Sequence, residues 1–78
     1  MNRKNIERRL KETHGKTPPM DFNSGYEYTF YRDYPRKGVA KDIARKAKKL
    51  GYLARVQPFK SGVTGRRKYM IWLARKEE

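Results

Sequence analysis

A run of five large apolar residues, from Tyr69 to Leu73, constrains the fold of this chain more than any other feature. Neighbouring residues of a strand point to opposite faces, so a strand of this composition is apolar on both sides. Such a strand belongs in the middle of a sheet, where other strands flank it and other parts of the protein cover it. A chain of 78 residues makes one small domain, with little material to cover both faces.

Three further segments have the patterns of regular structure. Alternating, aromatic-rich residues predict strands, and an apolar stripe that begins after Pro35 and ends before Gly51 predicts a helix. The expected elements are a strand over 26–34, a helix over 35–51, a strand over 52–60 and a last strand over 66–76. The order is therefore β-α-β-β, and the glycine-containing segment 61–65 supplies the turn between the last two strands.

The position of the last strand decides the topology. The order 1-2-3 keeps the first two strands adjacent, whereas the order 2-3-1 inserts the last strand between them. Pro58 cannot donate a ladder hydrogen bond, which places the second strand at an edge. The doubly apolar run favours the centre for the last strand. We therefore predict an α+β fold with a three-stranded antiparallel sheet of order 2-3-1 and one helix packed on one face.

The N-terminal third is expected to lie outside this fold. Residues 2–13 offer only Ile6 and Leu10 as large apolar side chains, and a helix of about 12 residues is marginal without packing. Residues 14–25 contain two prolines and two glycines, a composition typical of a linker. We predict a basic arm and linker over 1–25, either partly helical or disordered, and a single βαββ domain over 26–78.

One helix can cover only one face of the sheet. The helix is expected to contribute Val39, Ile43, Ala47 and Leu50 to this contact. The sheet is expected to contribute Tyr28, Phe30, Tyr52, Ala54 and Val56, together with either Tyr69, Ile71 and Leu73, which we favour, or Met70 and Trp72. The opposite face is expected to present Tyr31, Arg55, Gln57, Phe59, Lys68, Met70 and Trp72. Three hypotheses for that face stay open: an exposed platform, cover by the N-terminal segment, or burial in a two-fold dimer.

The charge of the chain indicates the class of its partner. Twenty-one Lys and Arg oppose eight Asp and Glu, which gives a net charge of +13 and a pI of about 10.4. A polyanion would relieve the self-repulsion, and so basic a small domain favours nucleic-acid binding. RNA is slightly favoured over DNA, because aromatic rings among cations can stack on unpaired bases.

Two groups of residues form the candidate binding site. Base stacking is expected on a platform of Tyr31, Arg55, Lys68 and Trp72. Phosphate contacts are expected from Lys37, Lys41, Arg45 and Lys48 along one side of the helix and from Arg66, Arg67 and Lys68 beside the turn. The helix stripe also allows another interpretation, in which the helix lies in a DNA groove.

The alternative from another class is a protein-interaction or homodimer module that buries Met70 and Trp72 against protein. We do not expect an enzyme, because cysteine is absent, His14 is the one histidine and no paired-carboxylate spacing recurs. We predict no cofactor and no metal. The sequence lacks both an apolar run of about 18 residues and the apolar segment of a signal peptide, so a cytoplasmic protein is expected.

Overall fold

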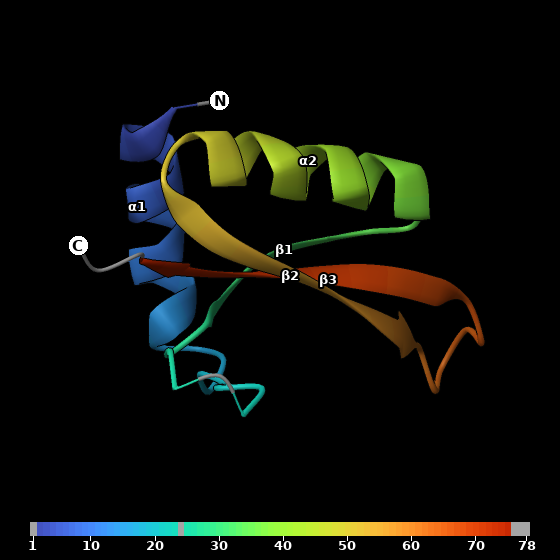
Figure 1. The fold of residues 1–78 in the computed structure, drawn as a ribbon. Helices are drawn as coiled ribbons and strands as arrows, with labels where there is room; N and C mark the ends of the chain where they lie inside the picture. The colour runs from blue at the N-terminus through green and yellow to red at the C-terminus, as the bar shows by residue number, and fades with distance from the viewer. Residues whose placement is uncertain (1, 24, 76–78) are drawn as a thin grey trace.

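The computed structural model describes residues 2–23 and 25–75 and shows two helices and one sheet (Figure 1). The elements in chain order are α1 (Arg3–His14), β1 (Thr29–Tyr34), α2 (Lys37–Lys49), β2 (Tyr52–Lys60) and β3 (Arg67–Arg75). The strands form an antiparallel sheet in the order β1-β3-β2, so the predicted α+β class and strand order are confirmed. Residues 1, 24 and 76–78 of the predicted segments lie outside the described residues.

The central strand is buried on both faces, as its composition requires. Ile71 and Leu73 belong to the main core, which lies between the sheet and the two helices. Trp72 and Ala74 belong to a second apolar cluster on the opposite face. We call these two sides of the sheet the helix face and the second face. Pro58 lies in β2 at the edge of the sheet, where a missing N–H leaves the central ladder intact.

Helix α2 packs on the sheet chiefly through three alanines; of the stripe predicted from the sequence, Ala47 is in the core and Ile43 and Leu50 pack against it. Ala40, Ala44 and Ala47, at i, i+4 and i+7, are buried, whereas Val39 is 43% exposed. The prediction that Val39 lies inside is therefore wrong. Small side chains let the helix axis approach the strands closely, and the larger Ile43 then fits beside this contact rather than beneath it.

The prediction of one packed helix is incomplete, because α1 also packs against the sheet. The side chain of Asn2 caps its first turn by accepting a hydrogen bond from the Asn5 N–H at 2.9 Å. Ile6 and Leu10 are buried in the main core, and α1 lies across the end of the sheet where β1 begins (Figure 1). Two apolar side chains one turn apart are thus enough to dock the helix when β1 provides a matching surface.

The aromatic residues of β1 lie on the faces opposite to those predicted. Phe30 is opposite Trp72, so Phe30 and Tyr28 pack on the second face, and alternation places Tyr31 on the helix face, buried in the main core. The predictions that Tyr31 lies on the second face and that Tyr28 and Phe30 lie beneath the helix are wrong, because alternation separates the two sets without deciding which of them faces the helices. A bulge follows: Arg32 is opposite Ile71, so Tyr31 is an extra residue in the ladder, and Tyr34 lies on the same face as Tyr31.

The linker between α1 and β1 covers the second face around Tyr28 and Trp72. Met20 pairs with Tyr28 through two backbone hydrogen bonds of 3.0 and 2.7 Å, which hold this segment beneath the sheet. Phe22 then makes edge-to-face contacts with Tyr28 and Trp72, at ring-centroid distances of 5.4 and 5.9 Å. Of the three hypotheses for this face, the structure shows cover by the N-terminal segment at Trp72.

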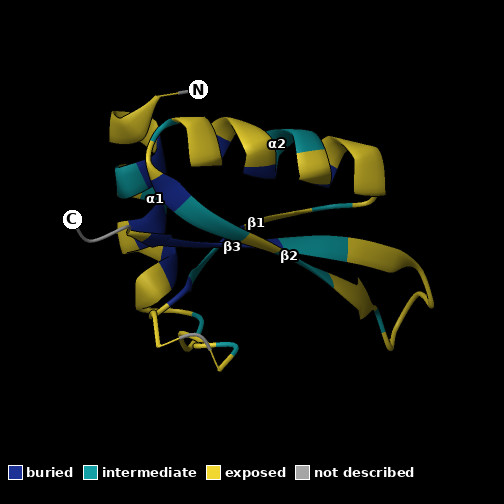
Figure 2. Ribbon diagram, in the orientation of Figure 1, coloured by how far each residue is buried: buried dark blue, intermediate teal, exposed yellow. Residues whose placement is uncertain are grey.

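The far end of the β2–β3 hairpin extends beyond both helices and the linker. Figure 2 shows this end exposed, in contrast to the buried half of the sheet beside α1. The molecule is accordingly elongated, with principal extents of 40 × 23 × 23 Å. No helix among the described residues is both long and apolar enough to cross a membrane.

Candidate nucleic-acid interface

The four predicted helix cations lie together on α2. Lys37, Lys41, Arg45 and Lys48 are all exposed. At 3.6 residues per turn, Lys37, Lys41 and Lys48 follow one flank of the buried alanines, and Arg45 lies just outside that flank. The opposite flank carries Ile43, which shares a groove with Tyr31 and Arg32 of β1. The lysine row therefore lies away from β1, and it spans about 16 Å along the helix.

The charges on this flank are not neutralised within the described part of the chain. Lys46 forms an ion pair with Asp42 at 3.4 Å, but no described acid pairs with any of the four predicted cations. Lys37 and Arg45 are each four residues from Lys41, and like charges at this spacing destabilise a helix slightly. A row of uncompensated cations can follow a phosphate backbone without reading base identity.

The second group of predicted cations lies at the exposed end of the β2–β3 hairpin. Arg66, Arg67 and Lys68 are exposed and directly follow the turn. The turn is ordered by two backbone hydrogen bonds of 2.9 Å, from the Ser61 N–H to the Arg66 carbonyl and from the Gly65 N–H to the Ser61 carbonyl. Gly65 has a φ of +70°, a left-handed conformation that favours glycine. The cations are therefore carried on a defined hairpin end.

Lys60 belongs to this group and was missed from the sequence. It lies directly opposite Arg67 in the β2–β3 ladder. Like charges in directly opposite positions destabilise a strand pair, and residues 52–75 contain no Asp or Glu to offset them. Counting outward from the turn, with Ser61 opposite Arg66, would have identified this pair. We call Lys60, Arg66, Arg67 and Lys68 the hairpin cations.

The aromatic members of the predicted platform are not accessible. Trp72 is 3% exposed, and Tyr31 is 7% exposed on the other side of the sheet. The Trp72 indole N–H donates to the Gln57 side-chain oxygen at 3.2 Å, and its ring contacts Phe22 and Phe30. The structure therefore separates these two residues and buries both of them, so neither presents a ring face for base stacking.

Arg55 and Lys68 remain exposed on the second face, but in different surroundings. The Arg55 guanidinium lies 5.6 Å from the ring centroid of Phe22 and 6.0 Å from that of Tyr28. It thus covers the aromatic cluster under the linker, in a cation–π arrangement. Lys68 lies opposite Phe59, which is 45% exposed, nearer the turn. Of the predicted platform, Lys68 is therefore the residue that joins the hairpin cations.

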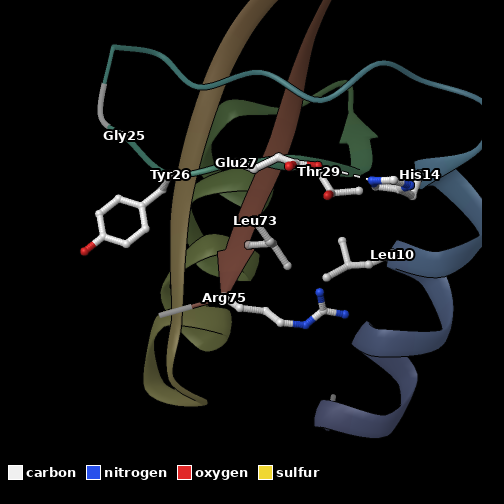
Figure 3. Close-up of a pocket in the computed structure, with 8 residues that line it drawn as sticks. All are labelled: Leu10, His14, Gly25, Tyr26, Glu27, Thr29, Leu73 and Arg75. Atoms are coloured by element: carbon white, nitrogen blue, oxygen red, sulfur yellow. Dashed lines mark hydrogen bonds and ion pairs between the residues drawn. The ribbon is translucent and has the colours of Figure 1, made fainter. Parts of the chain in front are cut away.

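A hollow at the opposite end of the molecule is lined by both acidic and basic side chains (Figure 3). Its wall includes Leu10, His14, Glu27 and Arg75, and Figure 3 shows His14 paired with Glu27 across the hollow, at 3.2 Å. Arg75 donates two hydrogen bonds to Glu7, at 2.7 and 2.9 Å. These bonds lower the pKa of Glu7 below its ordinary value of 4.5 and raise that of Arg75. The Glu7–Arg75 pair is thus balanced within the described chain, in contrast to the α2 row and the hairpin cations.

The described residues bring no three His, Asp or Glu side chains into a group that could hold a metal ion. Comparisons of the chain with models of protein families, with curated proteins and with solved structures gave no match. The two cationic surfaces, on α2 and on the hairpin, are accordingly the features from which we infer function.

Proposed function

We propose that this protein binds nucleic acid by contacting its phosphate groups with the α2 row and the hairpin cations. The observation that carries this proposal is the placement of Lys60 directly opposite Arg67, with no acid in residues 52–75. Such a pair lowers stability unless an external anion lies between or beside the two side chains. A phosphate backbone supplies regularly spaced anions, and each contact releases condensed counterions.

The proposal relies on phosphate contact rather than on base stacking. Burial of Trp72 and Tyr31 removes the physical reason for favouring RNA over DNA, since that preference depended on accessible rings. Basic side chains on a helix flank and on a hairpin end suit a backbone, which either polymer offers. Whether DNA or RNA is the ligand therefore depends on which phosphate backbone follows the α2 row and the hairpin cations more closely.

A protein-interaction module is the second candidate function. Phe59 is 45% exposed and Val63 is 96% exposed, so the hairpin end does present apolar surface. An acidic protein partner would satisfy the same cations. Trp72 and Met70 no longer form the anchor predicted for this alternative, because Trp72 lies beneath the linker and Met70 is half-buried in the same cluster.

Fluorescence anisotropy with labelled duplex and single-stranded DNA and RNA, across a range of salt concentrations, tests the proposal. We expect binding of at least one polymer at about 0.15 M salt, with a log–log salt slope of about −0.9 per phosphate contact on duplex DNA. The variant Lys37→Gln/Lys41→Gln should weaken binding and flatten the slope. The matched control is Lys4→Gln/Lys11→Gln, which removes two exposed cations from α1 instead.

Two results would contradict the proposal. The first is an unchanged anisotropy for all four polymers at about 0.15 M salt and protein concentrations up to about 0.1 mM, the weak limit of non-specific binding. The second is an equal loss of affinity in the α1 control and the α2 variant. That result would mean that only the net charge of the protein matters, and not a surface on it.

A further inference from the structure

The end of the β2–β3 hairpin is exposed on both of its faces, which is unusual for strands of a small domain. Residues 58–68 contain no buried residue, and Ser61 alone is half-buried (Figure 2). No residue of this end belongs to either apolar cluster of the sheet. We call residues 58–68 the ribbon. Its two strands protrude as a free double-stranded β-structure.

The hairpin cations are distributed over both faces of the ribbon. Lys60 and Arg67 form one cross-strand pair on the helix face, because Arg67 is two residues from the core residue Tyr69. Lys68 lies on the second face, two residues from Met70. Arg66 accepts a backbone hydrogen bond from Ser61 and follows the same alternation, so it lies on the side of Lys68.

An anionic partner lying on one side of the ribbon would satisfy only two of these four cations. A groove of a duplex places a phosphate backbone on each side of whatever enters it, so that both faces meet anions together. The tip of the ribbon, in contrast, is uncharged: Gly62, Val63, Thr64 and Gly65 form it. An uncharged tip with cations behind it matches a groove whose floor is base edges and whose rims are phosphates.

We propose that the ribbon inserts tip-first into the major groove of B-form DNA; this inference rests on the nucleic-acid binding proposed above. Two paired strands lie about 4.8 Å apart, and with their side chains they match a groove about 12 Å wide and about 8.5 Å deep. The major groove of an RNA duplex is too narrow for side chains to read. Val63, 96% exposed at the tip, would contact base edges, where thymine methyl groups offer apolar surface.

The ribbon is formed before any partner arrives. Besides the backbone bonds of the turn, the Thr64 N–H donates to the Ser61 hydroxyl at 3.4 Å and the Arg66 N–H donates to the Thr64 hydroxyl at 3.3 Å. A preformed element loses little conformational entropy on insertion. Helix α2, whose first residue is Lys37, begins toward the same end of the molecule (Figure 1), so the α2 row is placed to contact the backbone outside the groove.

The test compares two variants. Each variant removes both cations from one face of the ribbon. Lys60→Gln/Arg67→Gln changes the helix face, Arg66→Gln/Lys68→Gln changes the second face, and Lys4→Gln/Lys11→Gln is the control of equal charge. Binding is measured by anisotropy with one sequence as a DNA duplex, an RNA duplex and a DNA single strand. Circular dichroism checks that each variant folds.

For the DNA duplex, we expect each ribbon variant to weaken binding by about 30-fold at 0.15 M salt. This factor is what two phosphate contacts, with a log–log salt slope of about −0.9 each, contribute to affinity between 1 M and 0.15 M salt. Single-stranded DNA should respond to one ribbon variant only. Bound protein should also protect guanine N7 from methylation by dimethyl sulfate, because this atom lies in the major groove.

The outcomes separate the two proposals. If DNA binds but only one face matters, or guanine N7 stays reactive, the ribbon does not occupy the major groove and nucleic-acid binding still stands. If the RNA duplex binds as tightly as the DNA duplex, groove insertion is likewise overturned. If no nucleic acid binds and polyglutamate does, both proposals fail and an acidic protein is the partner.

Discussion

At the scale of single residues, burial and pairing matter more than residue type. Trp72 is an aromatic residue with Arg and Lys nearby in the sequence, as is typical of residues that stack on bases. In the structure, however, its ring contacts Phe22 and Phe30, and its indole N–H donates to Gln57. Glu7 and Arg75, which drew no attention in the sequence, form the pair with the best geometry among the described residues. Substitution of Trp72 and of Glu7 should therefore change stability in different ways.

Replacing Trp72 with Ala should destabilise the fold by about 3–5 kcal/mol, because a buried ring leaves a cavity between the linker and the sheet. Urea unfolding measures this change. Phe59→Ala on the same face is the matched control, and it should cost far less because Phe59 is 45% exposed. Equal stability of Trp72→Ala and the wild type would show that the linker does not cover the second face.

The Glu7–Arg75 pair should make stability depend on pH in the acidic range. The pKa of Glu7 is lowered in the folded protein, chiefly by the hydrogen bond from Arg75, so the ionised form stabilises the fold. This stabilisation is fully present above the unfolded value of about 4.5 and is lost as pH falls through the lower folded pKa. It should amount to about 1 kcal/mol or less, since Arg75 is largely exposed.

Glu7→Gln tests this expectation. Its free energy of unfolding should lie below that of the wild type at pH 7, and the two should converge as pH falls through the lowered pKa of Glu7 in the folded protein. Glu12→Gln is the control, because Glu12 makes one exposed contact with Arg9 at 3.6 Å. A difference that stays constant from pH 7 to pH 3 would exclude the proposed linkage.

At the scale of elements, the packing of the two helices depends on small side chains and on a bulge. Helix α1 docks with Ile6 and Leu10 beside Tyr31, the bulge residue of β1, whose side chain lies in the main core. Its Arg9 side chain donates to the Tyr31 carbonyl at 3.1 Å, and the Thr13 hydroxyl donates to the Phe30 carbonyl. The bulge thus offers both an apolar side chain and backbone carbonyls to α1.

Replacing a buried alanine of α2 with a larger residue should push the helix away from the sheet. Ala47→Leu adds three carbons at a fully buried position and should destabilise the fold by about 1–3 kcal/mol. Val39→Leu adds one carbon at a position that is 43% exposed, and it should change stability by less than about 0.5 kcal/mol. Thermal unfolding of both variants measures the contrast, and a reversed order would return Val39 to the core.

At the scale of the whole molecule, charge is separated from the acids that could balance it. Four ion pairs connect described residues, three of them involving α1 and one within α2. The hairpin cations take part in none of these ion pairs, although the register places Asp33 of β1 opposite Met70, two residues from Lys68. The repulsion at the hairpin therefore concerns above all Lys60 and Arg67, which are directly opposite each other.

Relieving this repulsion should stabilise the protein while weakening its binding. Lys60→Gln/Arg67→Gln should raise the free energy of unfolding in low salt by roughly 0.2–1 kcal/mol, because it removes a like-charge cross-strand pair. The gain should shrink in about 0.5 M salt, where charges are screened. Thermal melts at both salt concentrations measure it. Destabilisation by this variant would mean that the two side chains support the hairpin and are not held there for a partner.

The sequence by itself determined the features that depend on local periodicity and on proline. The doubly apolar run Tyr69–Leu73 predicted a central strand, and Pro58 predicted an edge strand, so the antiparallel order follows from the sequence. The face of Ile71 and Leu73 was also correct, because β3 keeps its alternation unbroken. These features depend only on the alternation of side chains along a strand and on the rule that proline, which lacks a backbone N–H, does not lie in a central strand.

Only the tertiary structure decided which surfaces remain accessible. The pairing of Phe30 with Trp72 put Tyr31 in the core rather than on the second face, and the linker placed Phe22 over Trp72. Neither event leaves a periodic signal, because each depends on contacts between segments distant in sequence. The opposition of Lys60 and Arg67 likewise comes from strand register. The candidate interface therefore moved from the middle of the sheet to the end of the hairpin, where no other segment covers it.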